Sequence, residues 1–172
     1  VGDSTWEEIN FIPGGAPAPV NFGWRCMEGP DCSFTQPNFC EPCGHPGYSQ
    51  AIYQYDHSTG GCSAIGGRVY RGDALPDMVG RYVFADFCAE GIYSFKEVGG
   101  VATDFKDHWV EMYSFNGAYT SPTCFGTDNA GELYAGAYYS DEVYKLVPWV
   151  PFVDLGNGLG GISGLPALEG DG

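Results

Sequence analysis

The stretch that decides the fold runs from Gly80 to Phe95 and reads GRYVFADFCAEGIYSF. A glycine precedes an apolar run, a short turn carries Glu90, and a second apolar run has Tyr93 at its centre. Runs of Val, Ile, Tyr and Phe that are bounded by turn residues are typical of β-strands joined in a hairpin. The sequence therefore predicts two antiparallel strands here.

The same pattern returns from Gly131 to Leu146, GELYAGAYYSDEVYKL, at an offset of 51 residues. Asp141 takes the place of the acid in the turn, and Tyr144 takes the place of the central tyrosine. Two unrelated hairpins would share some of this pattern, but the matched turns and tyrosines favour a structural repeat. An offset of this size fits one blade of a β-propeller, which has four strands.

The rest of the chain fits an all-β fold. Twenty-seven glycines and twelve prolines exclude a helical bundle. The stretch Val101–Asn116 is the longest without either residue; its spacing also fits a helix, but its aromatic and β-branched content favours a strand. Further strands are predicted at Ala51–Asp56, Arg68–Arg71, Tyr82–Phe87, Ile92–Phe95, Cys124–Thr127, Leu133–Tyr138 and Val143–Val147.

The charge of the chain excludes one class of partner. Twenty-two acidic residues against seven basic ones give a net charge of −15, which repels a phosphate backbone. We therefore expect no nucleic-acid partner. No apolar run approaches the roughly 18 residues that a transmembrane helix needs, so we also expect no membrane span.

Seven cysteines in 172 residues indicate an oxidising compartment, extracellular or periplasmic. Five of them fall between Cys26 and Cys62, which predicts a loop region held by disulfides. The spacing of Cys40 and Cys43 also fits half of a zinc site, although no second such pair follows. With an odd number of cysteines, one thiol is free or pairs outside the chain. The disulfide candidates are Cys26, Cys32, Cys40, Cys43, Cys62, Cys88 and Cys124.

Several motifs together resemble the glucose/sorbosone dehydrogenase-like β-propellers, which include soluble quinoprotein sugar dehydrogenases and the propeller of hedgehog-interacting protein. The motifs are VGD at 1–3, WEEIN at 6–10, NFGW at 21–24, YDHS at 55–58, GGRVYRG at 66–72, GRYVFADFC at 80–88 and GELY at 131–134. The resemblance runs in order from Val1 to Leu146.

The resemblance implies a six-bladed propeller, of which this chain holds the last two or so blades plus a disulfide-stapled loop region. We expect residues 1–63 to be loop-rich, residues 64–147 to form two blades, and residues 148–172 to be a Gly-rich linker or the start of a further domain. Since each blade buries its faces against its neighbours, the remaining blades must come from a parent chain, a partner chain or copies of this chain.

The resemblance also implies chemistry. Catalytic members bind pyrroloquinoline quinone through basic residues, with calcium and a histidine base. None of the three histidines (His45, His57 and His108) matches the family's histidine motif. Arg71 lies where the enzymes carry a basic residue on the cofactor, although pairing with Asp73 or Asp86 is an equally good explanation.

The arginine pair that the enzymes carry before their last blade is missing here, where the chain has Ser121-Pro122-Thr123. Losing two charged hydrogen bonds to a tricarboxylate costs several kcal/mol, at about 1.5–3 kcal/mol each. The sequence therefore favours a binding or assembly role and assigns no catalytic residue. The alternative is part of a quinone-dependent sugar dehydrogenase that oxidises its substrate by hydride transfer.

Two weaker sets of ligand candidates lie near the start of the chain. Glu7, Glu8 and Asn10 offer the oxygen ligands that calcium prefers, although solvated side chains are the simpler interpretation. Trp6 and Trp24 offer a stacking surface for a carbohydrate, although packing in the core is the commoner use of tryptophan.

Overall fold

The computed structural model describes residues 2–16, 19–33, 43–108 and 121–148. Within these ranges all strands pair antiparallel and the only helices are two short 3₁₀ turns, η1 (His57–Thr59) and η2 (Pro76–Met78), so the all-β prediction is confirmed. The strands are β1 (Trp6–Ile9), β2 (Met27–Glu28), β3 (Asp31–Cys32), β4 (Tyr53–Asp56), β5 (Ala64–Val69), β6 (Arg81–Asp86), β7 (Gly91–Val98), β8 (Val101–Asp107), β9 (Pro122–Thr127), β10 (Leu133–Ala137) and β11 (Val143–Lys145).

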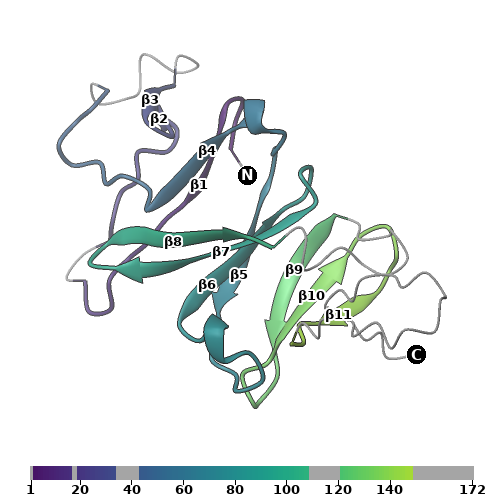
Figure 1. Ribbon diagram of the computed structural model, residues 1–172. Coiled ribbons are helices and arrows are strands. Elements are labelled where there is room, and N and C mark those ends of the chain that lie inside the picture. The colour runs from purple at the N-terminus through teal and green to yellow at the C-terminus, as the bar shows by residue number, and fades with distance from the viewer. Residues whose placement is uncertain (1, 17–18, 34–42, 109–120, 149–172) are drawn as a thin grey trace, which may run out of the picture.

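The central element is a four-stranded sheet whose strands follow one another in the order β5-β6-β7-β8. A second sheet, β9-β10-β11, lies on one side of it, and the two-stranded ribbon β1-β4 lies on the other (Figure 1). A short hairpin, β2-β3, stands apart beside the ribbon. A meander of four antiparallel strands is the form of a propeller blade.

The repeat predicted from the sequence is visible in the backbone. Gly80 and Gly131, which open the two copies, have φ of 81° and 82°. Glu90 and Asp141, in the turns that follow, have φ of 53° and 56°. Such left-handed conformations are uncommon outside glycine, so four matched angles show that the two hairpins are built alike.

The four-stranded sheet is buried on both faces at β6, where apolar residues occupy consecutive positions. Side chains of a strand alternate between its faces. Val83 and Ala85 face β9-β10-β11, whereas Phe84 faces the β1-β4 ribbon. On the first face the core consists of Tyr70, Val83, Ala85, Ile92, Phe125, Leu133, Ala135 and Leu146.

The second face is aromatic. Phe84 and Phe95 are buried there with Ile9 of β1, and four tyrosines pack around them: Tyr53, Tyr55, Tyr82 and Tyr93. This face therefore attaches the first part of the chain to the sheet.

One close approach explains a glycine of the GGRVYRG motif. A β-carbon at Gly67 would lie 1.4 Å from the carbonyl oxygen of Val83 in the neighbouring strand. The register of β5 against β6 shifts between Ile65 and Arg68, so this glycine sits in an irregularity that brings two backbones together. Any side chain here would separate β5 from β6.

The structure extends some sequence predictions. β5 begins at Ala64, four residues before the predicted strand, and β8 confirms the strand prediction for the first part of Val101–Asn116. The first 63 residues also contain β1, which pairs with β4 over its whole length. The remainder of Val101–Asn116 from 109 on, and the predicted linker from 149 on, lie outside the described residues.

Among the described residues, no helix has the length and apolar character to cross a membrane.

Candidate functional site

The junction between the β1-β4 ribbon and the four-stranded sheet is built on two buried carboxylates. Asp86, at the end of β6, is fully buried. Its carboxylate accepts a hydrogen bond of 2.6 Å from the Tyr55 hydroxyl. It also accepts hydrogen bonds from four backbone amides, those of Cys62, Ser63, Cys88 and Ala89.

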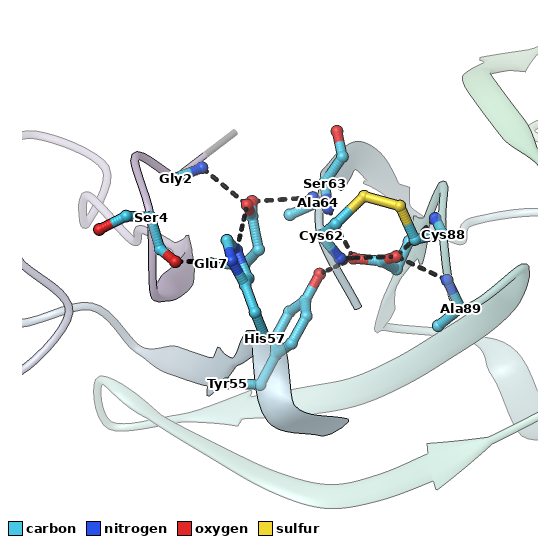
Figure 2. The surroundings of a disulfide bond; sticks show 11 residues. Gly2, Ser4, Glu7, Tyr55, His57, Cys62, Ser63, Ala64, Cys88 and Ala89 are labelled. Atoms are coloured by element: carbon cyan, nitrogen blue, oxygen red, sulfur yellow. Dashed lines mark hydrogen bonds and ion pairs between the residues drawn. A yellow bond between two sulfur atoms is a disulfide. The ribbon is translucent and has the colours of Figure 1, made fainter. Parts of the chain in front are cut away.

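A disulfide closes this junction. Cys62 is bonded to Cys88, and the bond spans the segment before β5 and the turn after β6 (Figure 2). One ligand atom from each cysteine and from Asp86 lies within 4.8 Å of the others, which has the composition of a metal site. Because both thiols are consumed in the disulfide, neither is available as a thiolate ligand.

The other described cysteines confirm the disulfide prediction except at Cys124, where it is wrong because the thiol is free. Cys32 is bonded to Cys43, so the zinc alternative for the pair at 40 and 43 is wrong as far as Cys43 is concerned. Cys26 is also disulfide-bonded. Cys124 is the one free thiol among the described cysteines, and it is exposed; Cys40 lies outside the described residues.

Glu7 is the second buried carboxylate of the junction. It is fully buried and accepts hydrogen bonds from the backbone amides of Gly2, at 2.7 Å, and Ala64, at 2.9 Å. The His57 Nε2 atom lies 3.2 Å from the same carboxylate, while Nδ1 lies 3.1 Å from the Ser4 carbonyl. Figure 2 shows these groups converging from β1, η1 and the start of β5.

The calcium candidates do not share one environment. Glu7 and Glu8 are neighbours on a strand and therefore point to opposite faces. Glu8 accepts a hydrogen bond of 2.6 Å from the Gly29 amide, and Asn10 is exposed. The interpretation of Glu7 as a solvated side chain is wrong, because β1 lies against the sheet and the carboxylate bonds backbone amides there.

Glu28 fixes the loop that precedes β1. Its carboxylate accepts hydrogen bonds from the amides of Ser4, Thr5 and Trp6. Burial acts to raise the pKa of Glu28, but these hydrogen bonds outweigh it and lower the pKa from 4.5 to about 2.

Glu132 joins the two larger sheets. It accepts a buried hydrogen bond of 2.6 Å from the Tyr70 hydroxyl, which follows β5. It also accepts from the amides of Asp73 and Ala74, each at 3.0 Å. The Tyr70 hydrogen bond lowers the pKa of Glu132 against the effect of burial, and burial together with Glu132 raises the pKa of Tyr70 to about 12. The carboxylate therefore stays ionised and the phenol stays neutral at neutral pH.

A buried serine–histidine pair is present that sequence reasoning missed. The Ser94 hydroxyl lies 2.7 Å from His108 Nε2, and it accepts a hydrogen bond of 2.8 Å from Arg81 Nε. Ser94 is fully buried and His108 nearly so. A substrate has no access to this hydroxyl, so the pair holds the sheet together and is no nucleophile.

Arg71 lies just beyond the end of β5 and is exposed. Neither of its predicted carboxylate partners pairs with it. Asp86 is taken by the tyrosine and the backbone amides described above, and within the described residues no salt bridge joins Arg71 to Asp73. Its side chain is therefore in the solvent.

The two tryptophans differ in burial. Trp6 is half-buried, and its indole nitrogen donates a hydrogen bond of 2.9 Å to Asp31. Trp24 is 68% exposed, so the expectation that it packs in the core is wrong.

No family model matches the chain. The HIPL1 protein of Arabidopsis thaliana is 29% identical over 178 residues, and the HIPL2 protein of the same plant is 32% identical over 169 residues. Each match covers 86% of this chain but only 23% of the relative, so the chain spans about a quarter of the length of the curated relatives that it matches.

A solved structure, the PQQ-bound form of an aldose sugar dehydrogenase from Streptomyces coelicolor, matches with a TM-score of 0.52 over 95% of this chain and 36% of that one. These matches confirm the resemblance to the glucose/sorbosone dehydrogenase-like family. At 18% identity the structural match shows the fold alone. The comparisons thus agree with the all-β architecture.

Proposed function

We propose that this chain is an extracellular β-propeller module that acts in binding or assembly rather than in catalysis. The observation that carries the proposal is the use of the buried charges. Glu7, Asp86 and Glu132 each accept hydrogen bonds from backbone amides of another segment, so these buried carboxylates join the sheets.

The disulfides support the extracellular part of the proposal. Cys32–Cys43 and Cys62–Cys88 staple loops to the first part of the chain and to the four-stranded sheet. Structural disulfides persist in oxidising compartments and are rare where glutathione keeps thiols reduced. Secretion is therefore the expected route.

The charges of the chain argue against binding of pyrroloquinoline quinone. The cofactor carries three carboxylates and needs cations around it. Ser121 and Pro122 are buried without a positive charge where the family has its arginine pair. Arg71 is the one exposed cation that aligns with a cofactor contact, and a net charge of −15 opposes an anionic ligand.

The alternative function is part of a quinone-dependent sugar dehydrogenase. The fold shared with the aldose sugar dehydrogenase favours it. In that case Arg71 would bind a cofactor carboxylate and the catalytic base would come from residues outside this chain. Calcium would then be a second cofactor.

One assay separates the two functions. The protein in its intact form is incubated with pyrroloquinoline quinone and calcium, and dye reduction is followed with aldoses and with sorbosone. A quinoprotein aldose dehydrogenase serves as the positive control. The proposal predicts no visible absorbance of bound quinone and no dye reduction; sugar-dependent turnover would overturn it.

The proposal also assigns the partners. The remaining blades come from a parent chain, a partner chain or further copies, and they would cover the outer face of β9-β10-β11. Any carbohydrate would be bound as a ligand rather than as a substrate.

A further inference from the structure

An aromatic cavity lies at the edge of the β1-β4 ribbon, next to the carboxylate junction, because Tyr55 lines the cavity and donates its hydroxyl to Asp86. Its volume is about 50 Å³, and five rings line it: Tyr53, Tyr55, Phe84, Tyr93 and Phe105. These rings come from β4, β6, β7 and β8, so four strands build one small cavity.

The rings support one another. Phe105 stacks on Tyr53 with centroids 5.0 Å apart, and on Tyr93 with centroids 5.8 Å apart. Phe84 forms the floor; it is 1% exposed, and its ring lies 5.4 Å from that of Tyr93. Phe105 is 43% exposed, so it forms a rim that a ligand can reach.

The cavity has a negative electrostatic character. Asp107 pairs with Tyr93 across β7 and β8, so both residues belong to the same face of the sheet. Burial and the charge of Asp107 raise the pKa of Tyr53. Burial, Asp107 and Asp86 raise the pKa of Tyr93 to about 12. Both phenols therefore stay neutral, and the carboxylates around them favour a cation.

The size of the cavity limits the ligand. One water molecule needs roughly 10–15 Å³, whereas sites for whole drug-sized molecules measure about 300–1,000 Å³. A cavity of about 50 Å³ has room for a few water molecules only, so a compact headgroup would enter it in part and the remainder of the ligand would lie outside.

We propose that these five rings form a binding site for a quaternary ammonium group, such as the headgroup of choline. Aromatic faces attract cations through their quadrupole, and methylated ammonium groups are the cations that aromatic cages bind. The methyl groups contact the apolar rings, and Asp107, which pairs with Tyr93 across β7 and β8, adds negative charge near the cavity.

The test is isothermal titration of the disulfide-bonded protein with tetramethylammonium and with choline, against 3,3-dimethylbutan-1-ol as the neutral isostere of choline. We expect saturable binding of both cations in the millimolar range or tighter, and binding of the neutral isostere that is weaker by about tenfold. No saturable heat at tens of millimolar, or equal binding of choline and its isostere, would overturn the proposal.

Two variants test whether choline binds in this cavity. Phe105→Leu removes the rim ring and is expected to weaken choline binding by about five- to tenfold, and Asp107→Asn by about threefold. Tyr139→Leu is the matched control, because Tyr139 is 66% exposed and lies outside the cavity. Equal affinity in Phe105→Leu and Tyr139→Leu would move the binding elsewhere and overturn the assignment.

A vesicle sedimentation experiment identifies which molecule supplies the ammonium headgroup. Phosphatidylcholine vesicles that sediment the protein, with free choline competing, indicate a lipid headgroup. Binding of free choline without sedimentation indicates a soluble compound. Both results support the site, and they differ only in which molecule supplies the ammonium group.

Discussion

Single buried carboxylates are the residues on which this fold depends most. Asp86 and Glu7 each bond several backbone amides, and an ionised carboxylate accepts such bonds on both of its oxygens. The sequence showed Asp86 only as an acid within the apolar run YVFADF. An acid in that setting is a signal of burial, but the pattern does not reveal its partners, which lie before β5 and in the turn after β6.

Replacing Asp86 tests this dependence. Asp86→Asn places an amide NH₂ where backbone amides donate, so it should lower the free energy of unfolding by about 2–4 kcal/mol. Tyr55→Phe removes one of the donors only and should cost about 1–2 kcal/mol. Urea unfolding measures both. Equal losses in the two variants would contradict the view that the amides carry most of the stabilisation.

The lowered pKa of Glu28 predicts that the free energy of unfolding depends on pH in the acid range. Its pKa is lower in the folded chain, at about 2, than the ordinary 4.5, so it stabilises the fold fully above pH 4.5. This contribution is lost as the pH falls from 4.5 to 2. The midpoint of urea unfolding, measured between these pH values, should fall less steeply in Glu28→Gln than in the unmodified protein. The surface control Asp77→Asn should leave the steep profile unchanged, and a steep profile in Glu28→Gln would refute the assignment.

At the scale of elements, the matched hairpins could be predicted from the sequence and β1 could not. The hairpins are local, and their apolar runs and turn residues lie within 16 consecutive residues. In contrast, β1 has two adjacent glutamates, which indicate a solvated segment, and its partner β4 lies more than 40 residues away. Trp6–Ile9 is a strand because it pairs with β4, and this pairing with a distant segment, which buries Glu7, cannot be recognised from a local pattern.

The two repeat glycines should respond differently to the same change. Both have positive φ, so alanine at either position costs about 1–2 kcal/mol. A β-carbon at Gly80 would meet nothing within 4 Å, whereas at Gly131 it would lie 2.9 Å from the Arg71 backbone. Thermal unfolding should therefore show a clearly larger loss in Gly131→Ala than in Gly80→Ala. The reverse order would mean that the contact between β5 and the second hairpin is looser than described.

The disulfide at the junction should contribute more to the stability of the fold than its position near the surface suggests. Cys62–Cys88 closes a loop with a sequence separation of 26. Removing it by the double change Cys62→Ser and Cys88→Ser should cost about 3–4 kcal/mol, because the unfolded chain gains freedom. Cys124→Ser, at the free thiol, is the control and should unfold at the same temperature as the unmodified protein. A similar melting temperature for the double variant would show that Asp86 and its amides hold the junction without the disulfide.

At the scale of the whole molecule, β6 and most of β7 in the central sheet are buried between two clusters, whereas among the described residues β9-β10-β11 packs with only one of its faces. Phe125, Leu133 and Ala135 face the central sheet. The opposite face presents Cys124 and Val143, which pair with Gly136 across the strands; Val143 is 61% exposed. The sequence motifs predict that this sheet belongs to the last blade of a propeller. It could not show the aromatic cavity, because the lining rings come from strands that the sequence separates by up to 52 positions.

The central claim is that these sheets are neighbouring parts of a propeller stack whose outer face needs another sheet. Multi-angle light scattering of the 172-residue chain over a range of concentrations tests it most directly. The account predicts masses above the 18.5 kDa of one chain, reduced towards that value by Val143→Lys on the outer face. A compact monomer at every concentration would contradict it.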